Sequence, residues 1–74
     1  MALLNKTLDY YMALPYTVTV EQNEDGWFAK VEELQGCMTE ADSEDMVRER
    51  IKEAMEAWIG VSLKEGLPIP EPAN

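Results

Sequence analysis

Carboxylates are the side chains with the greatest capacity for chemistry in this sequence of 74 residues, which has fifteen Asp and Glu residues and no histidine. A hydrolytic two-metal site needs several carboxylates that converge from neighbouring strands and a helix. On the expected strands only Glu21 and Glu40 are acidic, and both lie toward strand ends. The other acids fall in turns, in loops or on solvent-facing helical positions. We therefore predict no catalytic residue, no metal site and no cofactor.

The sequence also offers no activated nucleophile. Cys37 is the only cysteine, so it can form no disulfide within the chain, and it has no histidine to act as its base. We expect it to be a small buried apolar residue. Ser43 is typical of a helix N-cap, because a helical pattern begins directly after it. The four glycines are isolated, which argues against a glycine-rich phosphate-binding loop.

The first half of the chain predicts a short helix followed by a hairpin. Residues 6–14 have apolar side chains at helical spacing, and Pro15 ends this helix because the residue before a proline avoids the helical region. Residues 16–21 alternate between apolar and polar side chains, as a strand does, and residues 27–31 form the returning strand. Residues 23–26 supply the turn, since Asp-Gly is a strong hairpin signal.

The second half predicts a third strand and a long amphipathic helix. Residues 37–41 form the strand, and Ser43 caps a helix over residues 44–66, where Gly66 is a good stop. The tail, residues 67–74, is rich in proline and is expected to be extended. One apolar stripe runs along the helix with a period near 3.6 residues: Val47, Ile51, Ala54, Met55, Trp58 and Ile59.

These elements predict one α+β domain over residues 1–74, with a small three-stranded antiparallel sheet, one long helix on one face and a short N-terminal helix. A single helix covers one face of the sheet, so Phe28 and Met38 point to an open face if the alternation holds. A chain of this size buries a modest core and here has no disulfide or zinc site to reinforce it. We therefore expect a homo-oligomer, formed through the open face or an unpaired edge strand.

Charge indicates the kind of partner. Fifteen acidic and six basic residues give a formal net charge of −9, which repels phosphate backbones and disfavours direct nucleic-acid binding. The same charge attracts a basic protein, although it could serve solubility alone. We expect Glu24, Asp25, Glu32 and Glu33 to be electrostatic contacts, because they cluster in the hairpin turn and the neighbouring loop.

The sequence contains no targeting or membrane signal. No apolar run approaches the roughly 20 residues needed to cross a bilayer, and the N-terminus lacks the basic start and long apolar stretch of a signal peptide. A lone thiol fits a reducing compartment. We expect a cytoplasmic protein that does not engage membranes.

Five segments together resemble the HicB antitoxin family: residues 16–20 (YTVTV), 24–28 (EDGWF), 34–37 (LQGC), the capped helix 43–58, and 66–70 (GLPIP). The resemblance covers about residues 10–72. It implies a partial ribonuclease-H-like fold without an active site, and a place in a type II toxin–antitoxin pair. The partner would be a small basic HicA-type ribonuclease. Many HicB proteins carry a C-terminal DNA-binding module, for which we expect no room in this short form.

The sequence therefore predicts an antitoxin-like protein, not an enzyme, that binds and inhibits a small basic mRNA-cleaving toxin of the HicA type. The alternative is an orphan homo-oligomeric binding protein of the same fold without a toxin partner. A third hypothesis, an active ribonuclease-H-like enzyme, is disfavoured because the sheet carries threonines where carboxylates would be needed.

Overall fold

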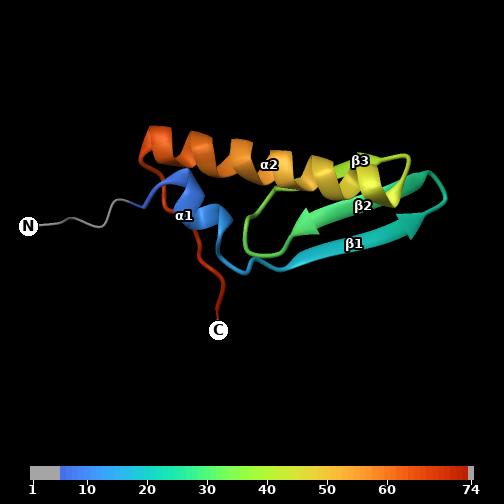
Figure 1. Ribbon diagram of the computed structural model, residues 1–74, viewed down its shortest axis with the longest axis horizontal. Coiled ribbons are helices and arrows are strands. Elements are labelled where there is room, and N and C mark those ends of the chain that lie inside the picture. Colours follow the sequence, from blue (N-terminus) through green and yellow to red (C-terminus); the bar gives the residue numbers. More distant parts are fainter. Residues whose placement is uncertain (1–5, 74) are drawn as a thin grey trace, which may run out of the picture.

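The computed structural model describes residues 6–73 (Figure 1). Five elements follow one another along the chain: α1 (Leu8–Met12), β1 (Val18–Asn23), β2 (Gly26–Val31), β3 (Met38–Ala41) and α2 (Glu44–Glu65). The strands form one antiparallel sheet in the order β1-β2-β3, so β1 and β3 are both edge strands. The predicted α+β class and its composition of elements are confirmed. The partial ribonuclease-H-like likeness stays a prediction.

The β1–β2 hairpin is closed by a two-residue loop. Asn23 pairs with Gly26, and the side chain of Asn23 accepts a hydrogen bond from the backbone N–H of Asp25 (3.0 Å). Gly26 has a φ of +136°, and a Cβ built on it would lie 2.8 Å from the carbonyl oxygen of Ala41. This turn therefore needs glycine both for its backbone conformation and for its close approach to β3.

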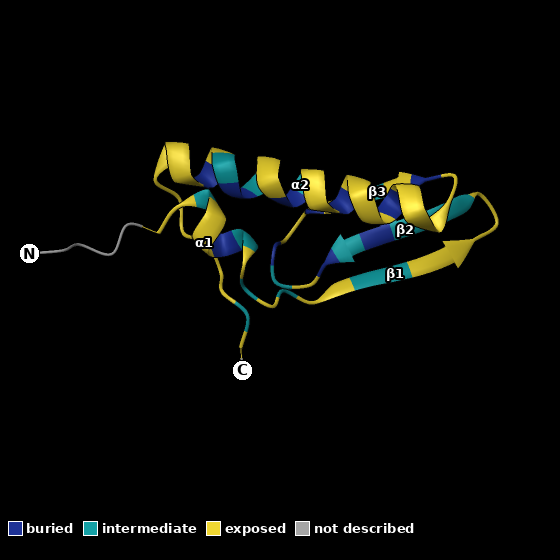
Figure 2. Cartoon of the chain, in the orientation of Figure 1, coloured by how far each residue is buried: buried dark blue, intermediate teal, exposed yellow. Residues whose placement is uncertain are grey.

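Helix α2 begins and ends as its sequence predicts. The Ser43 hydroxyl accepts a hydrogen bond from the Met46 N–H (3.2 Å). At the other end Gly66 adopts the left-handed conformation, and the Leu67 N–H donates to the Ser62 carbonyl (2.9 Å). One face of the helix packs mainly across β2 and β3, and it barely covers β1 (Figures 1 and 2). Its buried residues are Val47, Ile51, Met55, Ile59 and Ser62.

The C-terminal segment closes the α1 end of the fold. The Tyr16 hydroxyl donates to the carbonyl oxygen of Pro70 (2.6 Å), and burial raises the pKa of Tyr16 to about 12. Glu71 accepts hydrogen bonds from Lys6 (2.9 Å) and from the Tyr10 hydroxyl (3.1 Å). Ile69 packs against the core. The tail is therefore extended, as predicted, but it is bound across the N-terminal part of the chain.

Every predicted element differs from the structure by one or two residues at one end or both, and three of them, α1, β1 and β3, begin later than predicted. Helix α1 starts at Leu8 because the Thr7 side chain caps it by accepting from the Tyr10 N–H. Strand β1 spans Val18–Asn23, later than residues 16–21, because Asn23 still pairs with Gly26. Strand β3 starts after Cys37, whose N–H donates to the Leu34 carbonyl within the preceding turn (3.0 Å).

The predicted domain spans residues 1–74 and its tail residues 67–74, and of these residues 1–5 and 74 lie outside the described part of the chain. Across residues 6–73 the structure has no helix with the length and apolar character needed to span a bilayer.

Candidate protein-binding face

The candidate site is the face of the sheet opposite α2, here called the open face. Ala29 and Val31 of β2 point into the core and are buried. Phe28 and Lys30 alternate with them and must therefore point to the other face. Phe28 is partly exposed and does not pack against the core, in agreement with the predicted orientation.

Strand register places two carboxylates beside Phe28. Glu21 of β1 and Glu40 of β3 are its direct cross-strand partners, one on each side. Side chains at such positions have Cβ atoms about 4.5–5.5 Å apart. Both glutamates are exposed. An aromatic ring between two carboxylates suits a Lys or Arg side chain, because the ring face and both carboxylates attract the same cation.

Met38 gives the open face a second apolar contact and connects it to a groove. It lies opposite Lys30 on β2 and is 52% exposed. The groove, of about 560 Å³, runs between α2 and the chain that enters β3. Trp58, Val61 and Leu67 form part of its wall, and the last two are more than half exposed. Apolar surface of this kind is typical of a protein-binding region.

The four acids predicted as contacts do not form one cluster. Glu24 and Asp25 lie in the loop that joins β1 to β2, whereas Glu32 and Glu33 follow the opposite end of β2. The full length of the hairpin separates the two pairs, because the register runs from Asn23–Gly26 at one end to Val18–Val31 at the other. The sequence spacing suggested a cluster, but an antiparallel hairpin puts its turn and its open ends far apart.

Glu32 and Glu33 are both held by hydrogen bonds to threonines. The Thr19 hydroxyl donates to Glu32 (2.6 Å), and the Lys30 ammonium lies 3.8 Å from the same carboxylate. Glu33 accepts from the Thr17 backbone N–H (2.9 Å) and from its hydroxyl (2.8 Å), and these bonds lower the pKa of Glu33. This pair therefore has a structural role at the mouth of the hairpin in addition to its charge.

Cys37 is buried, and burial raises the pKa of its thiol, as expected for a small apolar residue. The described residues contain no group of three or more His, Cys, Asp or Glu side chains that could hold a metal ion.

Sequence reasoning named Phe28 and Met38 but missed Glu21 and Glu40 as part of the same surface. The alternation of side chains along the strands already placed Glu21 and Glu40 on one face or the other. Only the register shows that both carboxylates flank the phenylalanine, and register depends on loop lengths that local patterns do not determine.

Fold and site together define a small α+β domain whose sheet is covered on one face and open, acidic and partly apolar on the other. The chain belongs to the UPF0150-like family, whose profile matches residues 10–70. A UPF0150 protein from Archaeoglobus fulgidus is 41% identical over 49 residues, which cover 65% of this chain and 71% of the relative. No solved structure matches the chain.

Proposed function

We propose that this chain is an antitoxin-like protein that binds a small basic mRNA-cleaving toxin of the HicA type and inhibits it by covering its RNA-binding surface. The observation that carries the proposal is the open face, where Phe28 lies between Glu21 and Glu40 and Met38 is exposed beside them. A ribonuclease presents Lys and Arg side chains to phosphates, and the same side chains fit this arrangement.

Three further features support the proposal. The net charge of −9 steers a basic partner toward the chain and keeps RNA away from it. Membership of the UPF0150-like family is compatible with a toxin–antitoxin role. The resemblance of five segments to HicB antitoxins names the class of partner. Inhibition on this mechanism is steric, so the chain itself needs no catalytic group, metal or cofactor.

The test is an affinity purification of the tagged chain from its own cells, followed by identification of its partners by mass spectrometry. We expect a basic, histidine-containing protein of under about 100 residues in stoichiometric amount, as the resemblance to HicB antitoxins implies for a HicA-type toxin. The purified partner should cleave mRNA, and the chain should abolish that cleavage at a molar ratio near one. Full ribonuclease activity at saturating chain would contradict the proposal.

Substitutions locate the surface. Phe28→Arg and Met38→Arg each place a cation on the open face and should weaken binding of the partner at least about a hundredfold, as expected for central residues of an interface. Met46→Arg is the matched control, because Met46 is 41% exposed on α2, away from this face. Equal losses in all three variants would exclude the open face.

Charge reversal examines the acids at the two ends of the β1–β2 hairpin. Exchange of Glu24, Asp25, Glu32 and Glu33 for lysine should weaken binding and reduce its salt dependence, while unchanged affinity at moderate salt would remove these four from the proposal. Recovery of the chain alone would instead favour the orphan homo-oligomer, the alternative function for the same fold.

A further inference from the structure

We propose that two copies of this chain pair through the free edge of β1 to form a continuous six-stranded antiparallel sheet. The inference is independent of the proposed toxin partner, which would use the open face. The sequence predicted a homo-oligomer through the open face or an edge strand, and the structure favours one particular edge.

The direction in which the backbone groups of β1 point follows from the hydrogen bond between the residue before β1 and the residue after β2. The Glu32 N–H donates to the Thr17 carbonyl (2.9 Å), so Thr17 faces β2 with its backbone groups. In an antiparallel ladder the backbone groups of successive residues point alternately to one side and the other. The N–H and C=O groups of Thr19, Glu21 and Asn23 therefore also face β2. The N–H and C=O groups of Val18, Val20 and Gln22 therefore point out of the sheet, along an edge that no other strand within residues 6–73 covers.

The other edge of the sheet is protected. The Val31 N–H donates to the Cys37 carbonyl (3.0 Å), so by the same alternation the backbone groups of Met38 and Glu40 point outward on β3. The Arg50 guanidinium of α2 donates to the outward carbonyl of Glu40 (2.9 Å). A short strand with a cation on its edge resists pairing, whereas β1 has six residues and no such contact among the described residues.

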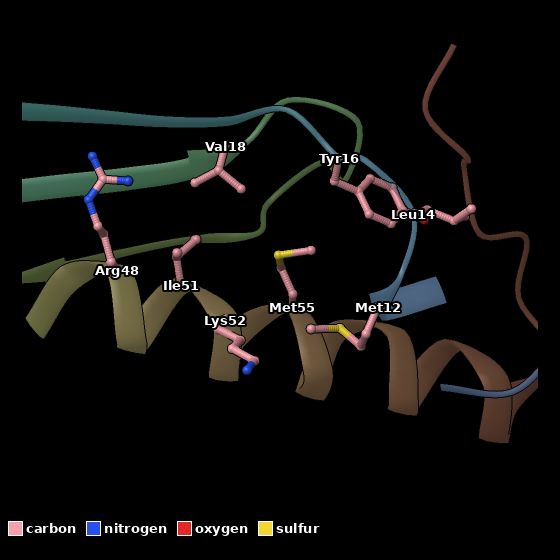
Figure 3. Close-up of a pocket in the computed structure, with 8 residues that line it drawn as sticks. All are labelled: Met12, Leu14, Tyr16, Val18, Arg48, Ile51, Lys52 and Met55. Carbon is pink, nitrogen blue, oxygen red and sulfur yellow. The ribbon is translucent and has the colours of Figure 1, made fainter. Parts of the chain in front are cut away.

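A groove of about 320 Å³ adjoins the β1 edge, because α2 barely covers this strand. Figure 3 shows Val18 and Tyr16 on one side of the groove and Ile51 and Met55 of α2 on the other. Val18 is 39% exposed there. A strand added to β1 would lie along the mouth of this groove and bury Val18.

The β1 edge can pair with a second copy of itself in an antiparallel register that uses all the outward groups of Val18, Val20 and Gln22. With Val20 on a two-fold axis, Val20 pairs with its own copy, and Val18 pairs with Gln22 of the second copy. All outward groups of these residues are then satisfied by about six hydrogen bonds. On the open face, Thr19 then lies opposite Glu21 of the second copy. A shift that placed Val20 opposite Gln22 of the second copy would set the two Glu21 carboxylates against each other, and like charges at such positions are unfavourable.

Charge also favours a second copy in this register. Lys52 lines the groove and makes no ion pair within residues 6–73. The register brings the hairpin loop of the second copy, with Glu24, to the level of Tyr16, which lines the same groove. The acidic loop of the second copy would then lie at a groove that Lys52 also lines, and attraction to this cation would offset part of the repulsion between two acidic copies.

The experiment compares two proline variants by analytical ultracentrifugation at micromolar concentration. Val20→Pro removes an outward N–H donor from the β1 edge, where proline is sterically tolerated, and should raise the dissociation constant of the dimer at least about tenfold. Glu40→Pro makes the same change on the β3 edge and should leave the dimer intact. A dimer that survives Val20→Pro, or one that Glu40→Pro disrupts equally, would overturn the proposal, as would a monomeric wild type.

Amide hydrogen exchange of the wild type gives a readout that does not depend on whether a variant folds. The amides of Val18, Val20 and Gln22 should be protected in the dimer and lose protection on dilution to the monomer, while the Glu40 amide should be unaffected by concentration. Fast exchange of the three β1 amides in a proven dimer would show that the copies associate elsewhere.

Discussion

Glu33, two residues after β2, holds Thr17, the residue that directly precedes β1. Its carboxylate accepts both the N–H and the hydroxyl of Thr17, sixteen residues away. The backbone hydrogen bond is the main cause of its lowered pKa, and the bond from the hydroxyl acts in the same direction. Because the folded state holds the charged form, the carboxylate contributes stability that depends on pH.

We therefore expect a pH-dependent difference between the wild type and Glu33→Gln. The folded-state pKa of Glu33 lies below its ordinary value of 4.5. The stabilisation is fully present above that value and is lost as pH falls through the folded-state pKa. The wild type should be more stable than Glu33→Gln at pH 7, and the difference should shrink at pH 3, as measured by urea denaturation. A difference that is equal at both pH values would show that the charge of Glu33 is irrelevant.

At the scale of residues, sequence reasoning succeeds where the partner of a side chain is close along the chain. Ser43 as a cap requires only a helix that starts beside it, and Cys37 as a buried thiol requires only an apolar context. The bond from Tyr16 to Pro70 spans 54 residues, and the contact from Arg50 to the Glu40 carbonyl crosses from helix to sheet. Contacts of this second kind depend on the assembled fold, and no local pattern predicts them.

Two glycines in different elements should respond in opposite directions to the same substitution. Gly26 opens β2 with a positive φ, and a Cβ there would lie 2.8 Å from a backbone oxygen of β3. Gly60 lies inside α2, its φ is not positive, and a Cβ there meets nothing within 4 Å.

Gly26→Ala should lower the free energy of unfolding by about 2–4 kcal/mol, through backbone strain and the clash with β3. Gly60→Ala should raise it by about 0.5–1 kcal/mol, because alanine loses less conformational entropy in a helix. Thermal or urea denaturation of the two variants beside the wild type checks both signs. Similar destabilisation in both would mean that Gly60 has a packing role.

At the scale of elements, local patterns were enough to predict every helix and strand in the described region. The two-residue alternation indicated β1 and β2, the preceding loop and the Ser43 cap bounded β3, and the period of 3.6 indicated α2 with its buried stripe. Their mutual placement was less predictable, because it depends on packing between distant segments. The displacement of α2 toward β3, which leaves β1 uncovered, is the main feature of the fold that periodicity could not show.

The charge of the whole molecule should make its stability depend on salt. The folded chain measures about 53 × 25 × 18 Å. At low ionic strength the nine excess negative charges therefore repel one another over most of the molecule. The screening length falls from about 30 Å at 0.01 M salt to about 8 Å at 0.15 M.

We expect the free energy of unfolding in urea to rise with sodium chloride over this range, by an amount on the order of 1 kcal/mol. Binding of a basic partner should weaken over the same range, because screening reduces an attraction in that case. A stability that is flat or falling with salt would indicate that local ion pairs outweigh the net charge.

The candidate site could be predicted from sequence only in outline. Net charge indicated a basic partner, and alternation exposed Phe28 and Met38 on one face of the sheet. The acids assigned from their sequence proximity, Glu24 and Asp25 with Glu32 and Glu33, proved to lie at opposite ends of the hairpin. The carboxylates that flank Phe28 are brought there by strand register, which is a property of the assembled sheet.

The hydrogen bond from Arg50 to the Glu40 carbonyl has a consequence for how far the sheet can grow. A domain with two unpaired edge strands can polymerise, because each added copy provides another unpaired edge, and the product is a continuous filament. A domain with only one free edge can pair with one other copy and can add no third. Growth then stops at two copies, so the Arg50 contact on β3 would limit the proposed assembly to a closed dimer.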